Sequence, residues 1–179
     1  SVTNFQQNIG GYDVSWGRWT EYAMSPELDG LTTPVNDELL WVTYQPSDLG
    51  VVSGRSGVVR YDNMINSLTQ SSMGQVSNVL VGMDVNFDVG SVSNGEISAE
   101  VPNYAWVGTF DGAINNGGLT LDFNGGSLIN SQAGSVTNAS GNIAGDFVGN
   151  NAQAIVGGFN MVDDANSANQ IEGVFVVQQ

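Results

Sequence analysis

Cysteine, histidine and lysine are all missing from this 179-residue chain. Without cysteine the chain can form neither a disulfide framework nor a thiolate metal site. Without histidine and lysine it lacks imidazole acid-base chemistry, imidazole metal ligands and lysine Schiff bases. Most catalytic constellations are therefore excluded, and a pair of carboxylates, as in glycoside hydrolysis, is the main one left.

Positive charge is scarce as well. Three arginines stand against 18 acidic residues, which gives a formal net charge of -15 at pH 7. A field of this sign repels nucleic-acid phosphates and anionic lipid head groups. We therefore expect neither nucleic acid nor a membrane surface as a partner. We interpret the charge mainly as a source of solubility, with an acidic face for a cation or a basic protein as the alternative.

Long apolar runs are also lacking. No segment reaches the roughly 18 consecutive apolar residues of a membrane helix, and the first residues lack the basic and apolar regions of a signal peptide. We expect a chain that is not embedded in a membrane. Any export signal or lipid anchor is expected to have been removed or to lie upstream.

Glycine is abundant where proline is rare, with 24 glycines against 4 prolines. Many glycines, with Asn and Ser, are typical of tight turns between short strands. Hydrophobic residues make up 41% of the chain, which is enough for a folded core. The length suits one domain, so we predict a single domain over residues 1–179.

Apolar and polar residues alternate most clearly from residue 79 to residue 89. Period two over that length predicts a strand with one buried and one wet face. Turn sequences such as Asn-Asn-Gly-Gly at 115–118 separate further strands. These are predicted near 14–22, 39–44, 58–62, 96–101, 106–110, 119–123, 139–148, 155–162 and 170–177. Loops are expected at 26–34 and 45–57, with one helical turn opening at Ser25–Leu28.

The closing block of the chain carries a family resemblance. It contains G-D-F-V-G at 145–149, Gly-Gly-Phe at 157–159 and Gly-Val-Phe at 173–175. In this order the motifs resemble the last strands of the transferrin-binding-protein-like β-barrel. Earlier in the chain, W-G-R-W at 16–19 is followed by the segments at 40–44 and 58–61. Together these segments are similar to those of barrels at the C-terminal end of some FecR-domain exported bacterial proteins.

The resemblance implies a barrel at the outer surface of a Gram-negative bacterium, and it does not imply transferrin binding. Small residues such as Gly145, Gly149, Gly157 and Gly158 suit barrel corners. The large side chains that we expect to fill the lumen are Phe147, Phe159 and Phe175. We predict an all-β fold, a single closed antiparallel β-barrel of eight or nine strands, mostly up-and-down, with at most one or two short helical turns.

Two groups of residues are candidate sites. Trp16, Arg18, Trp19 and Trp41 are candidates for a ligand-binding aromatic platform, with core packing as the more common use of tryptophan. Trp16 and Trp19 are three residues apart, so a regular strand sends them to opposite faces.

The second candidate is a metal site at Asp84, Asn86 and Asp88, whose D-x-N-x-D spacing is that of the start of a calcium loop. Glycine comes one place late for an EF-hand, and the intervening residues belong to the best strand. A solvated strand face is therefore the alternative to a Ca²⁺ site. No other cofactor is expected.

The composition and the resemblance together predict a non-enzymatic extracellular or surface module that binds another protein or a glycan, or has a structural role. The expected location is the cell exterior or the outer-membrane surface, with the periplasm as the alternative. Two other functions are considered: a small-ligand carrier that uses the barrel interior, and a carboxylate-based glycosidase.

Overall fold

The structure is a computed structural model that describes residues 2–20 and 38–179. The helical turn predicted at Ser25–Leu28 and the loop at 26–34 lie outside the described residues. Within the described part, no helix has the length and apolarity needed to cross a membrane.

Strands account for almost all of the regular structure in the described chain. In chain order the elements are β1 (Val2–Ile9), β2 (Tyr12–Thr20), β3 (Glu38–Tyr44), α1 (Leu49–Ser53), β4 (Val58–Tyr61), β5 (Asn63–Ser71), β6 (Ser77–Asn86), β7 (Ser91–Val101), β8 (Tyr104–Asn115), β9 (Gly118–Asn130), β10 (Val136–Val148), β11 (Ala154–Asp163) and β12 (Asn166–Gln178). The predicted turn at 115–118 is present: Asn116 and Gly117 have φ of 50° and 80°. Positive φ at both central residues is what a two-residue hairpin turn requires.

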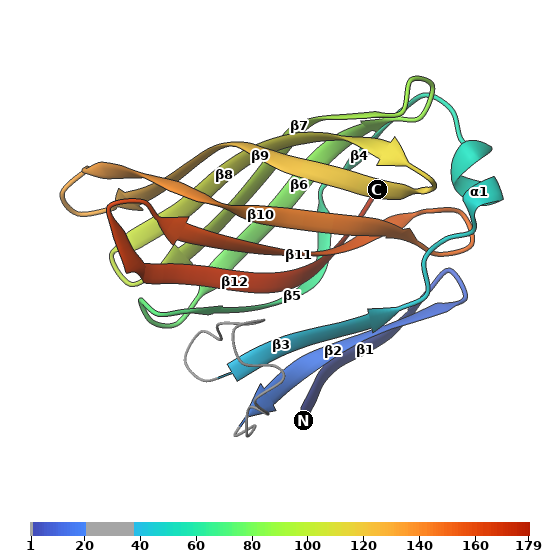
Figure 1. The fold of residues 1–179 in the computed structure, drawn as a ribbon. Coiled ribbons are helices and arrows are strands. Elements are labelled where there is room, and N and C mark those ends of the chain that lie inside the picture. The colour runs from blue at the N-terminus through green and yellow to red at the C-terminus, as the bar shows by residue number, and fades with distance from the viewer. Residues whose placement is uncertain (1, 21–37) are drawn as a thin grey trace, which may run out of the picture.

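Nine strands form one antiparallel sheet in the order β4-β6-β7-β8-β9-β10-β11-β12-β5. The two outermost strands of this order, β4 and β5, are separated in the chain by Asp62 alone. Since β4 pairs with β6 and β5 pairs with β12, one bent segment joins both ends of the sheet. The sheet is therefore a nearly closed barrel (Figure 1), and the predicted fold class is confirmed.

The first three strands form a sheet of their own, in the order β1-β2-β3. Figure 1 shows this small sheet lying against one side of the barrel. The sequence predicted strands at 14–22 and 39–44 but not their separation from the barrel. An alternating pattern reports which residues are buried, and it is the same whether a strand is part of the barrel wall or packs on its outside.

Hydrogen bonds join the small sheet to β10 and the residue after it, from the end of β3 and from the segment that follows β3. The Tyr44 hydroxyl donates a 2.6 Å hydrogen bond to Asp146 Oδ2. Ser47 donates from its backbone N to Phe147 O at 2.7 Å and from its Oγ to Gly149 O at 2.7 Å. Burial, together with the hydrogen bond to Asp146 and its charge, raises the pKa of Tyr44 to about 12.

Two hydrophobic cores lie on opposite faces of the barrel wall. The outer core joins the small sheet to β10, β11, β12 and β5, and its buried members are Ile9, Val14, Trp16, Val148, Ala154, Val156, Val174 and Val176. The lumen core includes Met83, Trp106, Phe110, Phe147, Ile155, Phe159, Met161, Ile171 and Phe175, with Val52 of α1 beside them. The predicted lumen positions of Phe147, Phe159 and Phe175 are confirmed.

Aromatic rings in the lumen lie directly on glycines of the barrel wall. A Cβ atom built on Gly157 would be 2.5 Å from Phe175 Cζ, and one on Gly173 would be 2.8 Å from Phe159 Cε1. Likewise, a Cβ on Gly108 would meet the Phe123 ring at 2.7 Å. These distances are shorter than van der Waals contact, so at these points the lumen has no room for even one more methyl group.

Gly157→Ala is expected to lower the free energy of unfolding by about 1 to 3 kcal/mol, the usual cost of overpacking a core. Its new methyl group would also lie 2.4 Å from Ala144 O. The next residue provides the control, because Gly158 faces outward and a Cβ there comes no closer than 3.3 Å to Gly173 O. Urea unfolding should show a smaller loss of stability for Gly158→Ala than for Gly157→Ala; equal losses in both variants would contradict a full lumen.

The turn between β11 and β12 is organised by a buried carboxylate. Asp163 is 4% exposed and accepts hydrogen bonds from Ala165 N and Asn169 Nδ2, both at 3.0 Å. Burial alone would raise the pKa of Asp163, but these bonds, with others from Thr137 and the Asn166 backbone, outweigh it and hold the pKa below its ordinary value.

The pKa of Asp163 is lower in the folded chain than in the unfolded chain, so the ionised carboxylate stabilises the fold at neutral pH. This stabilisation is lost as the pH falls from about 4 through the folded-state pKa. We therefore expect Asp163→Asn to lower stability at pH 7 by about 1 to 3 kcal/mol, and to differ less from the parent at pH 3. Urea unfolding at both pH values measures this, with Asp164→Asn at the exposed neighbouring position as the control.

Candidate functional site

The four residues of the predicted platform do not share one face. Val14, Trp16 and Arg18 alternate along β2 toward the barrel, and Trp16 is 1% exposed in the outer core, where its ring stacks on Phe5 with centroids 4.2 Å apart. Trp19 lies on the other face and is 43% exposed. Trp16 is thus a packing residue with no surface left for a ligand.

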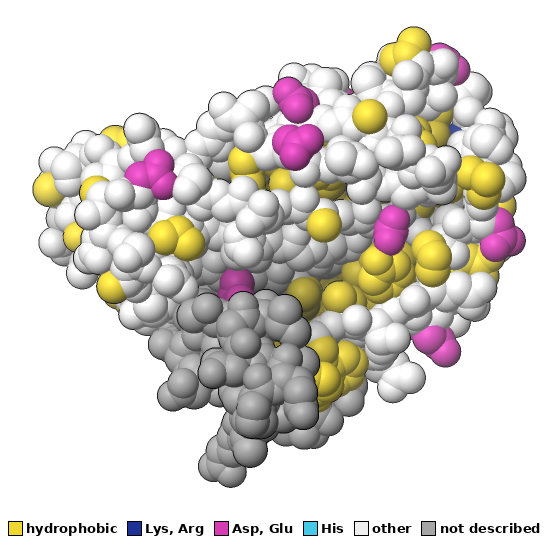
Figure 2. All heavy atoms as spheres, viewed as in Figure 1, with side chains coloured by type: hydrophobic (Ala, Val, Ile, Leu, Met, Phe, Trp, Pro, Cys, Tyr) yellow, Lys and Arg dark blue, Asp and Glu magenta, His cyan; other side chains and the backbone are white. Residues whose placement is uncertain are grey.

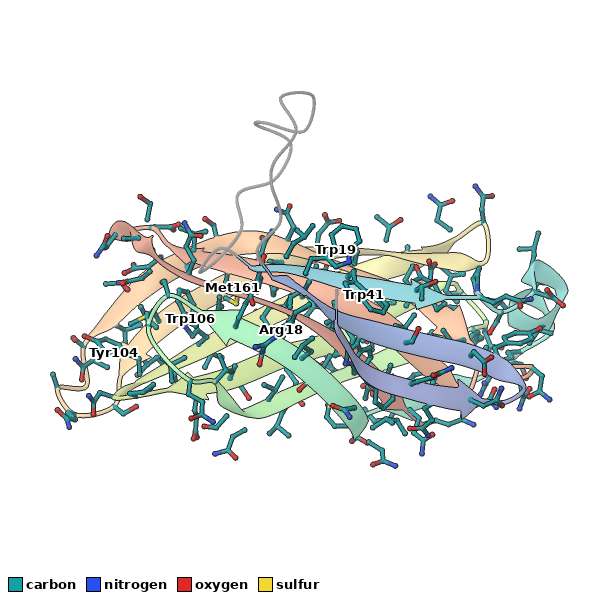
Figure 3. All side chains as sticks on the ribbon, turned by 90° about the horizontal axis from the view of Figure 1, so that it is seen from below. Arg18, Trp19, Trp41, Tyr104, Trp106 and Met161 are labelled. Atoms are coloured by element: carbon teal, nitrogen blue, oxygen red, sulfur yellow. The ribbon has the colours of Figure 1, made fainter. Side chains whose placement is uncertain are left out.

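Arg18, Trp19 and Trp41 lie near one another at one end of the small sheet, as Figure 3 shows. Arg18 Nη2 donates a 3.3 Å hydrogen bond to Thr69 O of β5, so its guanidinium bridges the small sheet and the barrel. Trp41 is half-buried on β3, where it is the strand partner of Gly17. Of the four, Trp19 presents the largest ring surface to solvent.

The calcium-like sequence does not gather its three side chains. Asp84 Oδ2 accepts a hydrogen bond from Asn94 at 2.7 Å, whereas Asn86 Oδ1 accepts from the backbone N of Asp88 at 3.1 Å. Asp88 Oδ1 in turn accepts from Gly57 N at 2.9 Å. Each oxygen is thus directed to its own partner, and no cluster of three acidic side chains suited to a metal occurs in the described ranges.

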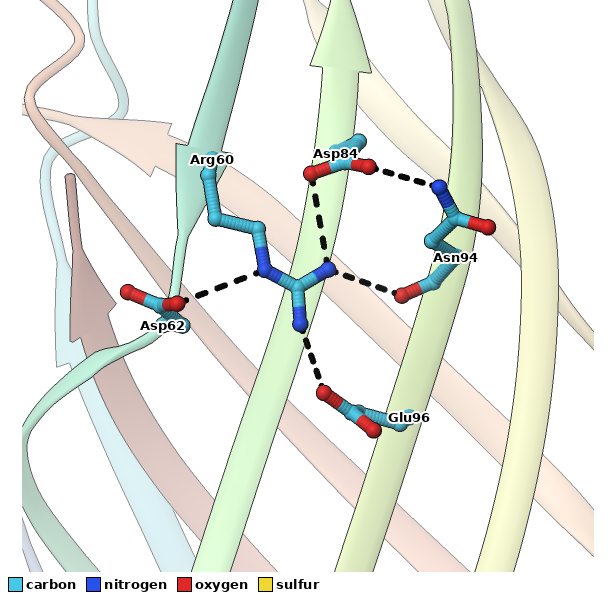
Figure 4. A network of polar contacts seen from close by, with 5 residues as sticks. All are labelled: Arg60, Asp62, Asp84, Asn94 and Glu96. Carbon is cyan, nitrogen blue, oxygen red and sulfur yellow. Dashed lines mark hydrogen bonds and ion pairs between the residues drawn. The ribbon is translucent and has the colours of Figure 1, made fainter.

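Acidic side chains from β6, from β7 and from Asp62 after β4 do meet on the outer face of the barrel, but Arg60 of β4 lies between them (Figure 4). Arg60 Nη2 is 2.6 Å from Glu96 Oε1. Its Nη1 is 3.4 Å from Asp84 Oδ1, and its Nε is 3.4 Å from Asp62 Oδ2. These carboxylates raise the pKa of Arg60, although its desolvation acts in the opposite direction. An arrangement held by a permanent cation offers no proton donor for carboxylate catalysis.

A groove opens on the outside of the barrel beside β3. It consists of two adjoining hollows of about 280 and 620 Å³ that share the residues Asn142, Asn160 and Glu172. Leu39 and Leu40 of β3 form one wall, and the outer faces of β10, β11 and β12 form the floor. Figure 2 shows hydrophobic side chains gathered in this crevice between the small sheet and the barrel. We call it the β3 groove.

Strand pairing arranges the floor of the β3 groove in three rows across the strands. The row nearest β3 is apolar and consists of Ala144, Gly158 and Val174. The middle row is entirely amide and carboxylate and consists of Asn142, Asn160 and Glu172. Gln70 of β5 pairs with Glu172 at the end of this row, but it is buried and lines neither hollow. The third row consists of Ser140, Val162 and Gln170.

The middle row is linked by its own hydrogen bonds. Asn160 Oδ1 accepts from the backbone N of Asn142 at 3.0 Å and from its Nδ2 at 3.4 Å. Gln70 Nε2 donates to Glu172 Oε1 at 2.5 Å. Asn142 and Asn160 are nevertheless exposed, so the row presents oriented amide groups to solvent.

Sequence reasoning missed this row. The signal was present in part, because Ile143, Phe159 and Ile171 point into the lumen and their neighbours Asn142, Asn160 and Glu172 must then point out. What the sequence does not contain is the register of the strands, which alone places these residues side by side.

Comparison with solved structures shows the fold. The chain is similar to the crystal structure of the isotype 1 transferrin binding protein B from serogroup B Neisseria meningitidis, with a TM-score of 0.56 and 15% identity. It is also similar to a double mutant of the vaccine antigen transferrin binding protein B from Haemophilus parasuis, with a TM-score of 0.52 and 16% identity. The chain therefore has the transferrin-binding-protein-like β-barrel fold that the closing motifs resemble.

The two matches cover 97% of this chain but only 35% and 36% of those proteins. The chain thus spans about a third of the length of the proteins it matches. No protein-family model matches the sequence, and no curated protein matches it.

Proposed function

We propose that the chain is a non-enzymatic binding module exposed on the surface of a Gram-negative bacterium, and that it contacts another macromolecule through the β3 groove. The small sheet and the barrel share the outer core, so we propose that they act as one domain over residues 1–179. The barrel then serves as a rigid support for the groove.

The filled lumen is the observation that carries this proposal. A carrier of small apolar ligands needs an internal cavity of a few hundred Å³. Here the lumen is occupied by Trp106, Phe110, Phe147, Phe159 and Phe175, and rings lie on wall glycines closer than a methyl group allows. The concave surface that remains for a partner is outside the barrel.

Two further observations support a binding role. Where Asp62, Asp84 and Glu96 approach one another, Arg60 is bound between them, which disfavours a glycosidase. The structural neighbours are proteins named for binding a macromolecule, transferrin. We do not extend that partner to this chain, because likeness of fold does not transfer a ligand.

Site-specific photo-crosslinking tests the proposal. The photoreactive residue p-benzoylphenylalanine replaces Ala144 in the groove floor or Ala113, an exposed residue of β8, and each protein is irradiated with the surface fraction of the source cells. We expect a macromolecular adduct from position 144 that excess unlabelled parent protein removes. No such adduct is expected from position 113. Absence of any adduct, or equal adducts from both positions, would contradict the proposal.

A further inference from the structure

We propose that the β3 groove binds a neutral oligosaccharide along its polar middle row. This inference rests on the proposed function and adds the chemical class of the partner.

The middle row has the chemistry that sugar hydroxyl groups need. Each hydroxyl both donates and accepts hydrogen bonds, and so does each side-chain amide, while a carboxylate accepts. Asn142, Asn160 and Glu172 combine these groups on three adjacent strands. Neighbouring strands are about 4.8 Å apart, so the row extends over roughly 10 Å. That span suits two linked sugar rings better than a single one.

Hydrogen bonds within the row hold its amides in place before a ligand arrives. Asn160 Oδ1 is fixed by two donors from Asn142, which orients the Asn160 amide so that its Nδ2 is available as a donor. Asn160 Nδ2 donates to no group in the described part of the chain. Preorganisation of this kind lowers the entropy lost on binding.

The apolar row of Ala144, Gly158 and Val174 offers a surface on which the apolar face of a sugar ring can pack. Ala144 and Gly158 are small, so the floor is low at this point. Leu39 and Leu40 rise beside it from β3, and Val174 continues the apolar surface. An apolar strip next to a row of polar groups matches the two kinds of surface that a sugar ring presents.

Charge selects a neutral ligand over the alternatives. Glu172 lies in the row and the chain carries a formal charge of -15, so acidic polysaccharides and phosphates are repelled. A basic peptide would be attracted, but two of the three groups in the row are amides and only one is an acid. The amides would leave most of its positive charges without a partner in the groove.

The test is binding of the purified domain to an array of neutral and acidic oligosaccharides, followed by calorimetry with each neutral oligosaccharide that binds. We expect binding to neutral oligosaccharides and none to acidic ones. Ala144→Trp, which fills the groove at an exposed position, should weaken binding at least 10-fold, whereas the control Ala113→Trp should not change it. Asn160→Ala should weaken binding about 5- to 10-fold, the effect of one lost hydrogen bond.

Three outcomes would overturn the oligosaccharide assignment. These are no binding to any neutral oligosaccharide, equal binding to acidic ones, and binding that Ala144→Trp leaves unchanged. Calorimetry with a lysine-rich peptide separates this failure from failure of the proposed function. If the peptide binds and Ala144→Trp abolishes its binding, or if the crosslinked partner is a protein, the groove is a binding site but not for a sugar.

Discussion

Replacing Phe175 with alanine is expected to lower the free energy of unfolding by about 3 to 5 kcal/mol, the usual cost of removing a buried phenylalanine ring. Phe175 is 0% exposed in the lumen, in the middle of the closing strand β12, and its ring lies against Gly157. Its backbone pairs with β11 on one side and with β5, the last strand in the sheet order, on the other. Urea unfolding followed by tryptophan fluorescence measures the loss.

Phe175→Leu keeps most of the apolar volume and should cost less than Phe175→Ala. Val89→Ala is a second control, because Val89 is 73% exposed and its truncation should change stability by no more than about 0.5 kcal/mol. A loss below 1 kcal/mol for Phe175→Ala would mean that the lumen rearranges around the missing ring. That result would be incompatible with a tightly filled barrel.

Replacing Trp16 with alanine is also expected to remove about 3 to 5 kcal/mol of stabilising free energy. The loss should fall mainly on the small sheet and its contact with the barrel. Trp16 is the largest buried side chain of the outer core and holds the small sheet against the barrel wall. Without it, backbone amides of β1, β2 and β3 should exchange with deuterium far faster than those of the barrel. Hydrogen exchange read by mass spectrometry resolves the two sheets.

Trp19 provides the matched control, since it has the same side chain on the same strand but faces solvent. Trp19→Ala should leave both the unfolding free energy and the exchange pattern nearly unchanged. If Trp16→Ala instead accelerated exchange uniformly over all strands, the small sheet and the barrel would unfold as one cooperative unit. The small sheet could then not unfold from the outer core while the barrel stays folded.

Alternation and turn chemistry were enough to predict most of the barrel. The pattern at 79–89 corresponds to β6, and inward residues such as Met83 and Val85 are fully buried. β6 ends at Asn86, because Asn86 starts a turn by accepting hydrogen bonds from Asp88 N and Val89 N. A local hydrogen bond from a side chain competes with strand pairing, and the alternation of apolar and polar residues does not reveal it.

The candidate sites were harder to predict because they depend on contacts between distant strands. The spacing of Trp16 and Trp19 correctly indicates opposite faces, but only the packing of the small sheet decides which face is covered. In the same way, Asn142, Asn160 and Glu172 are 12 or more residues apart in the chain and become neighbours through the register of β10, β11 and β12. A single sequence records the alternation within each strand but not this register.

The most direct test of the account is whether the lumen admits a ligand. The domain is titrated with laurate, an apolar probe, while the indole N–H resonance of Trp106, which is 1% exposed in the lumen, is followed by NMR. A filled barrel with its binding surface outside predicts that this resonance does not shift at any laurate concentration. A saturable shift of the Trp106 signal would show an open interior and would contradict the account.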